Sequence, residues 1–169
     1  MNGIDILRDA ASRPLDAAEA LRDKLDAETL NAHVGGHPNS VAWLLWHAGR
    51  EIDAQLADLA DHQELWVSED FAELTGFGEE GSRVGYGDSA EQARAVTAEE
   101  PGPLLEYLSA VTEALLAYLD TLDEDALGEV IDDSWDPPVT RGARLVSIVD
   151  DAAQHVGQAA YVVGVPEKA

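Results

Sequence analysis

The chain contains no cysteine among its 169 residues. This absence excludes disulfides, CxxC redox pairs, thiolate-rich zinc sites and a catalytic thiol supplied by the protein itself. Any thiol chemistry at this protein must therefore use a thiol that comes from outside the chain.

Basic residues are scarce, with 10 Lys and Arg against 34 Asp and Glu and a formal net charge of -24. A surface this negative repels phosphates and anionic lipid headgroups. We therefore expect a small-molecule substrate, no nucleic-acid partner and no membrane partner. The same charge favours solubility and a monomer or homodimer.

Long apolar runs are missing as well. Residues 1–9 lack the basic and apolar regions of a signal peptide, and no segment reaches the roughly 18 consecutive apolar residues of a membrane span. We expect a cytoplasmic protein. The length of the chain falls within the usual range for one domain, so residues 1–169 are predicted to form a single domain.

No segment shows sustained strand alternation, whereas four segments carry the 3.6-residue period of a helix. The first helix is predicted over roughly residues 3–25, with Pro14 either kinking it or opening its second half. The other three run from Asn39 or Ser40 to near Asp61, from Pro101-Gly102-Pro103 to near Leu122, and from an N-cap at Thr140 to Gly164. The sequence therefore predicts an all-α four-helix bundle.

Residues 62–100 differ from the rest, because they are rich in glycine and have little periodicity. We interpret them as a long crossover with short helical turns, and expect one more short turn at residues 123–127. An up-down-down-up bundle needs such a connection between its second and third helices.

Three residues form a candidate metal site. Asp151 and His155 are four residues apart, so on a helix they lie on one face. His47 is the other histidine in the middle of a predicted helix, within the apolar run 41–48. Two histidines and a carboxylate suit Zn²⁺, with Ni²⁺ as the alternative, and leave a coordination position open for water or substrate.

Each of these residues also has a structural explanation. A single helical histidine such as His155 is more often a partly buried side chain than a ligand, and Asp151 beside Asp150 could belong to a solvated acidic face. His47 is harder to explain in this way, because an unpaired buried imidazole costs free energy. His33 and His37 lie in a loop, which favours a turn or the rim of a substrate site, and His62 is expected at the surface.

Several further residues are candidates for contacts around the site. Gln158 lies one turn beyond His155 and could bond a metal-bound water or a ligand side chain. Trp43 and Trp135 are candidates for the mouth of the site, although tryptophans are more often core residues. Arg50 and Arg141 are scarce cations that could hold a substrate carboxylate or form surface ion pairs.

At these residues the chain resembles the DinB-like superfamily of metal-dependent four-helix bundles. Within it, the chain is similar to the mycothiol transferases and the mycothiol-dependent maleylpyruvate isomerase-like proteins. The resemblance covers essentially the whole chain. It is carried by residues 37–47, by Trp135-Asp136-Pro137-Pro138-Val139-Thr140 and by residues 151–161.

The resemblance implies particular ligands. The family's histidine on helix two carries over to His47, and its histidine or glutamate four residues before a histidine on the last helix carries over to Asp151 and His155. Aspartate at position 151 is one methylene shorter than the family's glutamate.

The resemblance also implies a function, in which a low-molecular-weight thiol such as mycothiol or bacillithiol binds the open metal position and transfers to an electrophile. The expected function is thus a metal-dependent thiol S-transferase or a related isomerase. The alternatives are a hydrolase that uses metal-bound hydroxide, or a non-catalytic bundle that binds a metal or another ligand. A non-heme iron oxygenase ranks last, because a helical bundle is an unusual home for its ligand triad.

Overall fold

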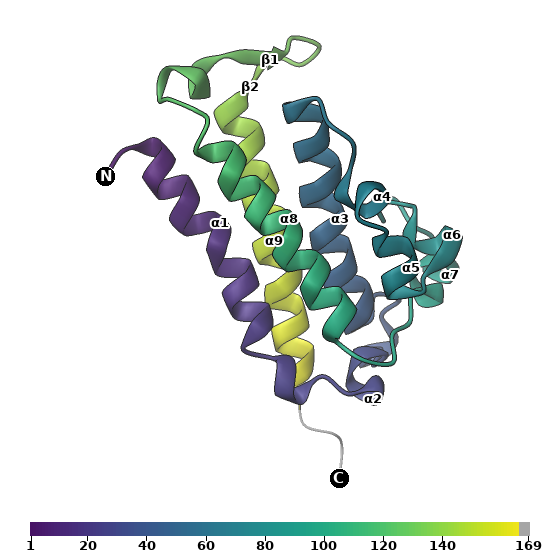
Figure 1. The fold of residues 1–169 in the computed structure, drawn as a ribbon. Helices are drawn as coiled ribbons and strands as arrows, with labels where there is room; N and C mark the ends of the chain where they lie inside the picture. Colours follow the sequence, from purple (N-terminus) through teal and green to yellow (C-terminus); the bar gives the residue numbers. More distant parts are fainter. Residues whose placement is uncertain (166–169) are drawn as a thin grey trace.

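Four long helices make up most of the molecule (Figure 1). The structure is a computed structural model and describes residues 1–165. They are α1 (Gly3–Glu19), α3 (Val41–Ala60), α8 (Gly102–Leu119) and α9 (Arg141–Gly164). The remaining elements are short: η1 (Arg22–Lys24), α2 (Ala27–Leu30), η2 (Val34–Gly36), α4 (Leu65–Ser68), α5 (Phe71–Thr75), α6 (Gly78–Gly81), α7 (Ala90–Ala95), η3 (Asp125–Gly128), β1 (Val130–Asp132) and β2 (Val139–Thr140). The predicted all-α four-helix architecture is confirmed.

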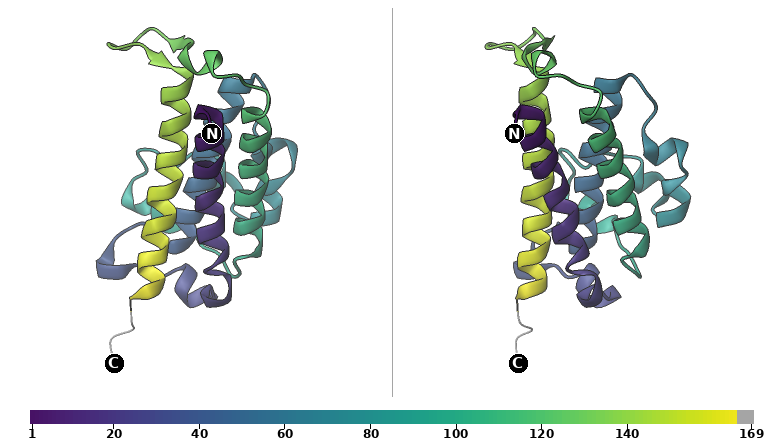
Figure 2. Two further views of the ribbon diagram at one scale, coloured as in Figure 1. Left: turned by 90° about the vertical axis from the view of Figure 1, so that its left-hand side faces the viewer. Right: turned by 60° about the vertical axis from the view of Figure 1, so that its left-hand side comes forward.

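The long helices run in an up-down-down-up order. Helices α1 and α9 point in one direction and α3 and α8 in the other (Figures 1 and 2). Helices α1 and α3 each pack against both α8 and α9, so α1 and α3 lie diagonally opposite. The chain between α3 and α8 returns along the bundle through α4 to α7, on the side of α3 away from α1, which confirms the predicted long crossover.

Side-chain caps fix the start of the two helices that matter most for the site. The Ser40 hydroxyl accepts a hydrogen bond from the Trp43 backbone N–H, and the Thr140 hydroxyl accepts one from Ala143. These bonds satisfy first-turn donors that have no partner within the helix. Helix α3 ends at Asp61, which adopts the left-handed conformation of a C-cap, so the predicted bounds of this helix are confirmed.

Two helix ends differ from the prediction. The first helix ends at Glu19 rather than near residue 25, and the chain continues through the tight turn η1. Leu25 follows this turn and is buried in the core. It therefore continues the apolar period in the sequence although it lies outside the helix. The third helix ends at Leu119 rather than near Leu122, while the short turn expected at residues 123–127 is present as η3.

A small hairpin was not predicted. Strands β1 and β2 pair antiparallel, with Val130 opposite Thr140, and they lie over the start of α9 at one end of the bundle (Figures 1 and 2). They contain three and two residues, which is too short to give a recognisable alternation.

The crossover is fastened to the bundle by a buried polar network. The Asp53 carboxylate accepts hydrogen bonds from the backbone N–H groups of Leu65 and Trp66 and from the Tyr107 hydroxyl, each at 2.8 Å. It therefore caps α4 from a neighbouring helix and ties α3, α4 and α8 together.

No helix among residues 1–165 is both long and apolar enough to cross a membrane.

Candidate metal centre

The packing of α3 against α9 brings together the three residues that the sequence singled out. His47 projects from α3, and Asp151 and His155 project from α9. Each offers one ligand atom, and these atoms all lie within 4.8 Å of one another. His47, Asp151 and His155 thus form a three-residue cluster that is compact enough for a single ion to lie between the side chains.

His47 is held in one orientation by the crossover. The Nδ1 atom of the buried imidazole lies 2.7 Å from the Val84 carbonyl oxygen, to which it donates a hydrogen bond. The Trp43 ring stacks on the imidazole at 4.5 Å with an interplanar angle of 19°. Because Nδ1 carries the proton, Nε2 keeps its lone pair for a ligand.

A glycine makes this approach of the crossover sterically feasible. Gly85 follows Val84 and has a φ of +97°, a conformation that side chains with a Cβ rarely adopt. A Cβ at this position would lie 2.6 Å from His47 Nδ1 and 3.0 Å from the Trp46 ring. The crossover can therefore come this close to His47 only with glycine at position 85.

His155 and Asp151 form the other half of the cluster. His155 Nδ1 lies 2.9 Å from the backbone carbonyl oxygen of Asp151 and 3.3 Å from its Oδ2. The imidazoles of His47 and His155 meet edge to face, with centroids 4.4 Å apart. As in His47, the hydrogen bond at Nδ1 leaves Nε2 available.

The donor set fits a divalent cation. Asp151 Oδ2 is buried and makes no hydrogen bond to residues 1–165, although it lies 3.3 Å from His155 Nδ1. A buried carboxylate oxygen without a hydrogen bond costs free energy, and a cation would offset that cost. Together with two available imidazole nitrogens, it completes the His₂-carboxylate set of three-ligand zinc sites.

The pKa values of the two imidazoles shift in opposite directions. Burial lowers the pKa of His47, and the neighbouring His155 lowers it further, so the neutral, ligating form of His47 is favoured. Burial also acts to lower the pKa of His155, but the carboxylate and carbonyl of Asp151 outweigh it and raise the pKa. Asp151 therefore stabilises positive charge at the cluster.

Glu51 was missed in the sequence. It lies one turn beyond His47 on α3, and the Gln55 side-chain amide donates a 3.0 Å hydrogen bond to its carboxylate. Burial raises the pKa of Glu51, and the nearby Asp151 raises it further. The i+4 spacing from His47 was a signal that could have identified this second acidic group.

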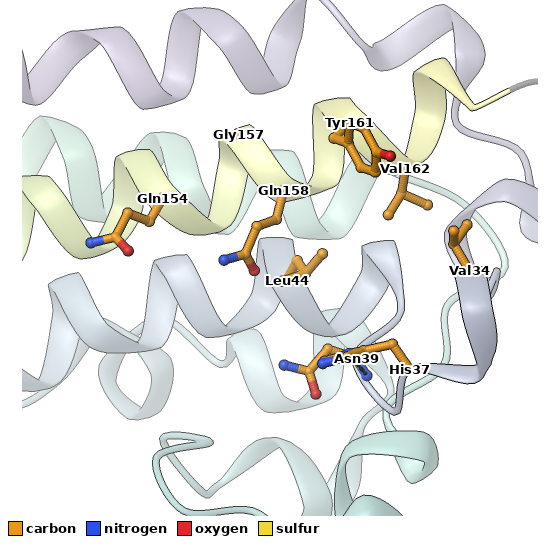
Figure 3. A pocket seen from close by; sticks show the side chains of 9 residues that line it. All are labelled: Val34, His37, Asn39, Leu44, Gln154, Gly157, Gln158, Tyr161 and Val162. Carbon is orange, nitrogen blue, oxygen red and sulfur yellow. Dashed lines mark hydrogen bonds between the residues drawn. The ribbon is translucent and has the colours of Figure 1, made fainter.

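Two of the predicted neighbours of the site lie close to it. Trp43 stacks on His47, and its indole N–H donates to the Asp88 carboxylate at 3.2 Å. Gln158 lines a groove between α3 and α9 with a volume of about 560 Å³, to which His37 also contributes (Figure 3). His62, in contrast, is exposed, as expected.

Arg50 is not available to a substrate. Its side chain is only 1% exposed, and its guanidinium donates to the Arg83 carbonyl, the Tyr107 hydroxyl and the carboxylates of Asp53 and Glu64. The idea that it holds a substrate carboxylate is wrong, because it stabilises the buried network instead. It is not a surface ion pair either.

Arg141 and Trp135 lie away from the cluster. Arg141 is 14 residues before His155, which on a helix is roughly 21 Å. Its guanidinium pairs with Glu129 at 2.7 Å and donates to the Tyr118 hydroxyl. Trp135 lies between the two strands of the hairpin and is 66% exposed. Neither residue is placed to contact a ligand at the three-residue cluster.

Comparisons with known proteins identify the family of the chain. The crystal structure of a conserved protein from Enterococcus faecalis superposes with a TM-score of 0.88 at 32% sequence identity, and the similarity covers 96% of each chain. No curated protein matches the chain. Residues 11–159 match the family profile described as the DinB superfamily. With its up-down-down-up bundle and its possible His/Asp/His metal site, the chain belongs to the DinB superfamily.

Proposed function

We propose that the chain binds a divalent metal ion through His47, Asp151 and His155 and is a thiol-dependent transferase or isomerase. Zn²⁺ is the expected ion and Ni²⁺ the alternative. The observation that carries the proposal is that ligand atoms of His47, Asp151 and His155 lie within 4.8 Å of one another, where Asp151 Oδ2 is buried without a hydrogen bond and both imidazoles have a bonded Nδ1. Three protein ligands are characteristic of catalytic sites, because they leave a position for substrate or water.

The chemistry follows from the cluster and from the composition. A divalent ion at this position would stabilise the thiolate form of a coordinating thiol at neutral pH. The chain has no cysteine, so that thiol must be a free co-substrate, for which the family resemblance suggests a mycothiol-like molecule. The chain's own part is to hold the two imidazoles in fixed orientations and to cover His47 with Trp43.

Hydrolysis is the second candidate, and Glu51 is the observation that favours it. A carboxylate one turn from His47 and close to Asp151 could accept a proton from an attacking water. Turnover of ester and amide substrates with and without added thiol separates the two functions. Turnover that needs no thiol would decide for hydrolysis.

Zinc titration of the chelator-treated full chain tests the metal site. We expect His47→Ala to lower zinc affinity by more than about 100-fold, since loss of outer contacts to a ligand alone costs about 10–100-fold. His62→Ala is the matched control, because His62 is exposed and should leave the affinity unchanged.

A second pair of variants tests the carboxylate. Asp151→Asn should weaken zinc binding, whereas Asp150→Asn should not, because the Asp150 side chain bonds Gln154 at the surface. Conjugation of mycothiol to a chromogenic electrophile should require zinc and should disappear in His47→Ala. Equal zinc affinity in all four variants and the native chain would refute the metal site. Zinc binding without any thiol conjugation would refute only the thiol chemistry.

A further inference from the structure

The groove beside the three-residue cluster has an unusual position. It lies between the start of α3, the second half of α9 and the segment 33–39 (Figure 3). Three of its lining residues, Leu44, Gln154 and Gln158, are each three residues from His47, Asp151 and His155, respectively. Side chains three apart on a helix are neighbours, so one end of the groove adjoins the cluster.

Among the residues that the structure describes, the lining of this groove contains no ionisable side chain other than His37 and Tyr161. Its polar groups are the amides of Asn39, Gln154 and Gln158, the imidazole of His37 and the phenol of Tyr161, and no Lys, Arg, Asp or Glu among residues 1–165 lines it. The nearby Arg94 donates to the Gly36 carbonyl at 2.6 Å and is not part of the lining. An anion in this groove would therefore find no Lys or Arg of the described lining to pair with.

The polar groups of the groove are nevertheless free to bind a ligand. The side-chain amides of Asn39 and Gln158 make no hydrogen bond to residues 1–165, and Gln154 uses only its Nε2, in a bond to Asp150. His37 Nδ1 accepts a bond from the Asn39 backbone, so the N–H of this ring is at Nε2. Leu44, Val34 and Val162 supply apolar wall between these groups.

We infer that the groove binds an uncharged arm of the substrate or co-substrate, one that carries amides or hydroxyls, and that it rejects carboxylates and phosphates. The net charge of -24 acts in the same direction, because it repels anions before they reach the groove. The inference rests on the proposed function only in placing the reacting group at the cluster. The charge selectivity of the groove can be measured without metal.

Two blocked thiols of similar size test this selectivity on the full chain. S-methyl pantetheine is neutral and rich in amides and hydroxyls, whereas S-methyl glutathione carries carboxylates. With the sulfur methylated, binding does not depend on a free thiol. Each probe is titrated into the metal-free and the zinc-loaded protein. Binding is followed by the NMR shifts of the side-chain amides of Asn39, Gln154 and Gln158.

We expect the neutral probe to shift these amides in both forms of the protein and the anionic probe to leave them unchanged in the metal-free form. Equal binding of the two probes, binding of neither, or shifts confined to other residues would overturn the inference. These outcomes do not depend on zinc affinity, so a failure of the groove is distinguishable from a failure of the metal site.

Variants check that the lining itself selects the ligand. Gln158→Leu keeps the size of the side chain but removes its hydrogen bonds, and should weaken binding of the neutral probe by about five- to tenfold. Gln63→Leu, at an exposed position outside the groove, is the control and should have no effect. Tyr161→Lys places a cation in the groove and should make the anionic probe bind; unchanged selectivity in this variant would contradict the inference.

Discussion

The orientation of His47 depends on atoms from two segments that are far apart in the sequence. Trp43 of the same helix stacks on one face of the ring, and the Val84 carbonyl fixes the proton on Nδ1. A buried imidazole with one nitrogen already satisfied can rotate little. The ring is therefore preorganised for a ligand at Nε2, which lowers the entropic cost of binding one.

Gly85→Ala tests this arrangement. The added Cβ would lie 2.6 Å from His47 Nδ1 at a backbone φ of +97°, so the crossover must move and the bond from His47 to Val84 must lengthen. We expect the free energy of unfolding to fall by about 2–4 kcal/mol from strain and overpacking together, with weaker zinc binding. Urea denaturation and zinc titration measure the two effects.

Gly87→Ala is the matched control. Gly87 also has a positive φ, of +76°, but a Cβ there meets no atom within 4 Å. The free energy of unfolding of Gly87→Ala should fall by only about 1 kcal/mol, from backbone strain alone, and its zinc affinity should stay unchanged. If both variants lose the same stability and the same affinity, the close contact with His47 does not matter.

At the scale of residues, local spacing predicted which side chains share one face of a helix. It did not predict the contacts between segments that are far apart in the sequence. Asp151 and His155 were paired correctly because four residues make about one helical turn. The role of Val84 and Gly85 could not be read, since it depends on the path of the crossover. Both alternatives for Arg50, a substrate contact and a surface ion pair, were wrong because a single sequence does not show that Asp53, Glu64 and Tyr107 surround it.

At the scale of elements, the crossover and α3 depend on each other. Residues 41–50 of α3 are all buried, because α8, α9 and the crossover cover the helix on all sides. The crossover in turn contains only the short helices α4 to α7. It relies on the hydrogen bonds that Asp53 and Arg50 make to it. The wall of the cluster around His47 is thus only as stable as this network.

Asp53→Asn is a direct test of that dependence. The amide keeps the volume of the carboxylate but cannot accept all of the bonds from Leu65, Trp66 and Tyr107, and it leaves the buried Arg50 with less compensating charge. We expect the free energy of unfolding to fall by about 2–4 kcal/mol and limited proteolysis to cut first within residues 62–100.

Asp58→Asn provides the comparison, because Asp58 lies on the same helix but is exposed. Its stability should stay within about 0.5 kcal/mol of the native chain. Cleavage of Asp53→Asn at sites spread over the whole chain would argue against a locally anchored crossover.

Element ends were predicted well where a cap marks them and poorly where none does. Ser40 and Thr140 made the starts of α3 and α9 visible in the sequence. The end of α1 carries no glycine or proline signal, and the buried Leu25 continues the apolar period beyond it. The hairpin of β1 and β2 is held by pairing between two very short strands, which no local pattern reveals.

At the scale of the whole molecule, negative charge is the dominant unfavourable feature of the folded state. With 34 acidic and 10 basic residues, most carboxylates have no cation to pair with, and several of the arginines are already committed to single partners, such as Arg13 to Asp9 and Arg22 to Glu19. The compact state brings these carboxylates closer together than the unfolded chain does. Self-repulsion therefore opposes folding.

Salt should consequently stabilise the protein. Raising NaCl from about 20 mM to about 500 mM shortens the screening length from tens of ångströms to a few, which removes most of the repulsion between surface carboxylates. We expect the Tm of the metal-free protein to rise by about 3–8 °C, as for a gain of about 1–2 kcal/mol in the free energy of unfolding of a chain of this length.

Screening is nearly complete within this range of salt concentration, so the rise in Tm should level off. A Tm that changes only at higher salt would instead indicate a general effect of salt on apolar burial. A Tm that falls with salt would show that ion pairs such as that of Arg50 with Glu64 outweigh the repulsion.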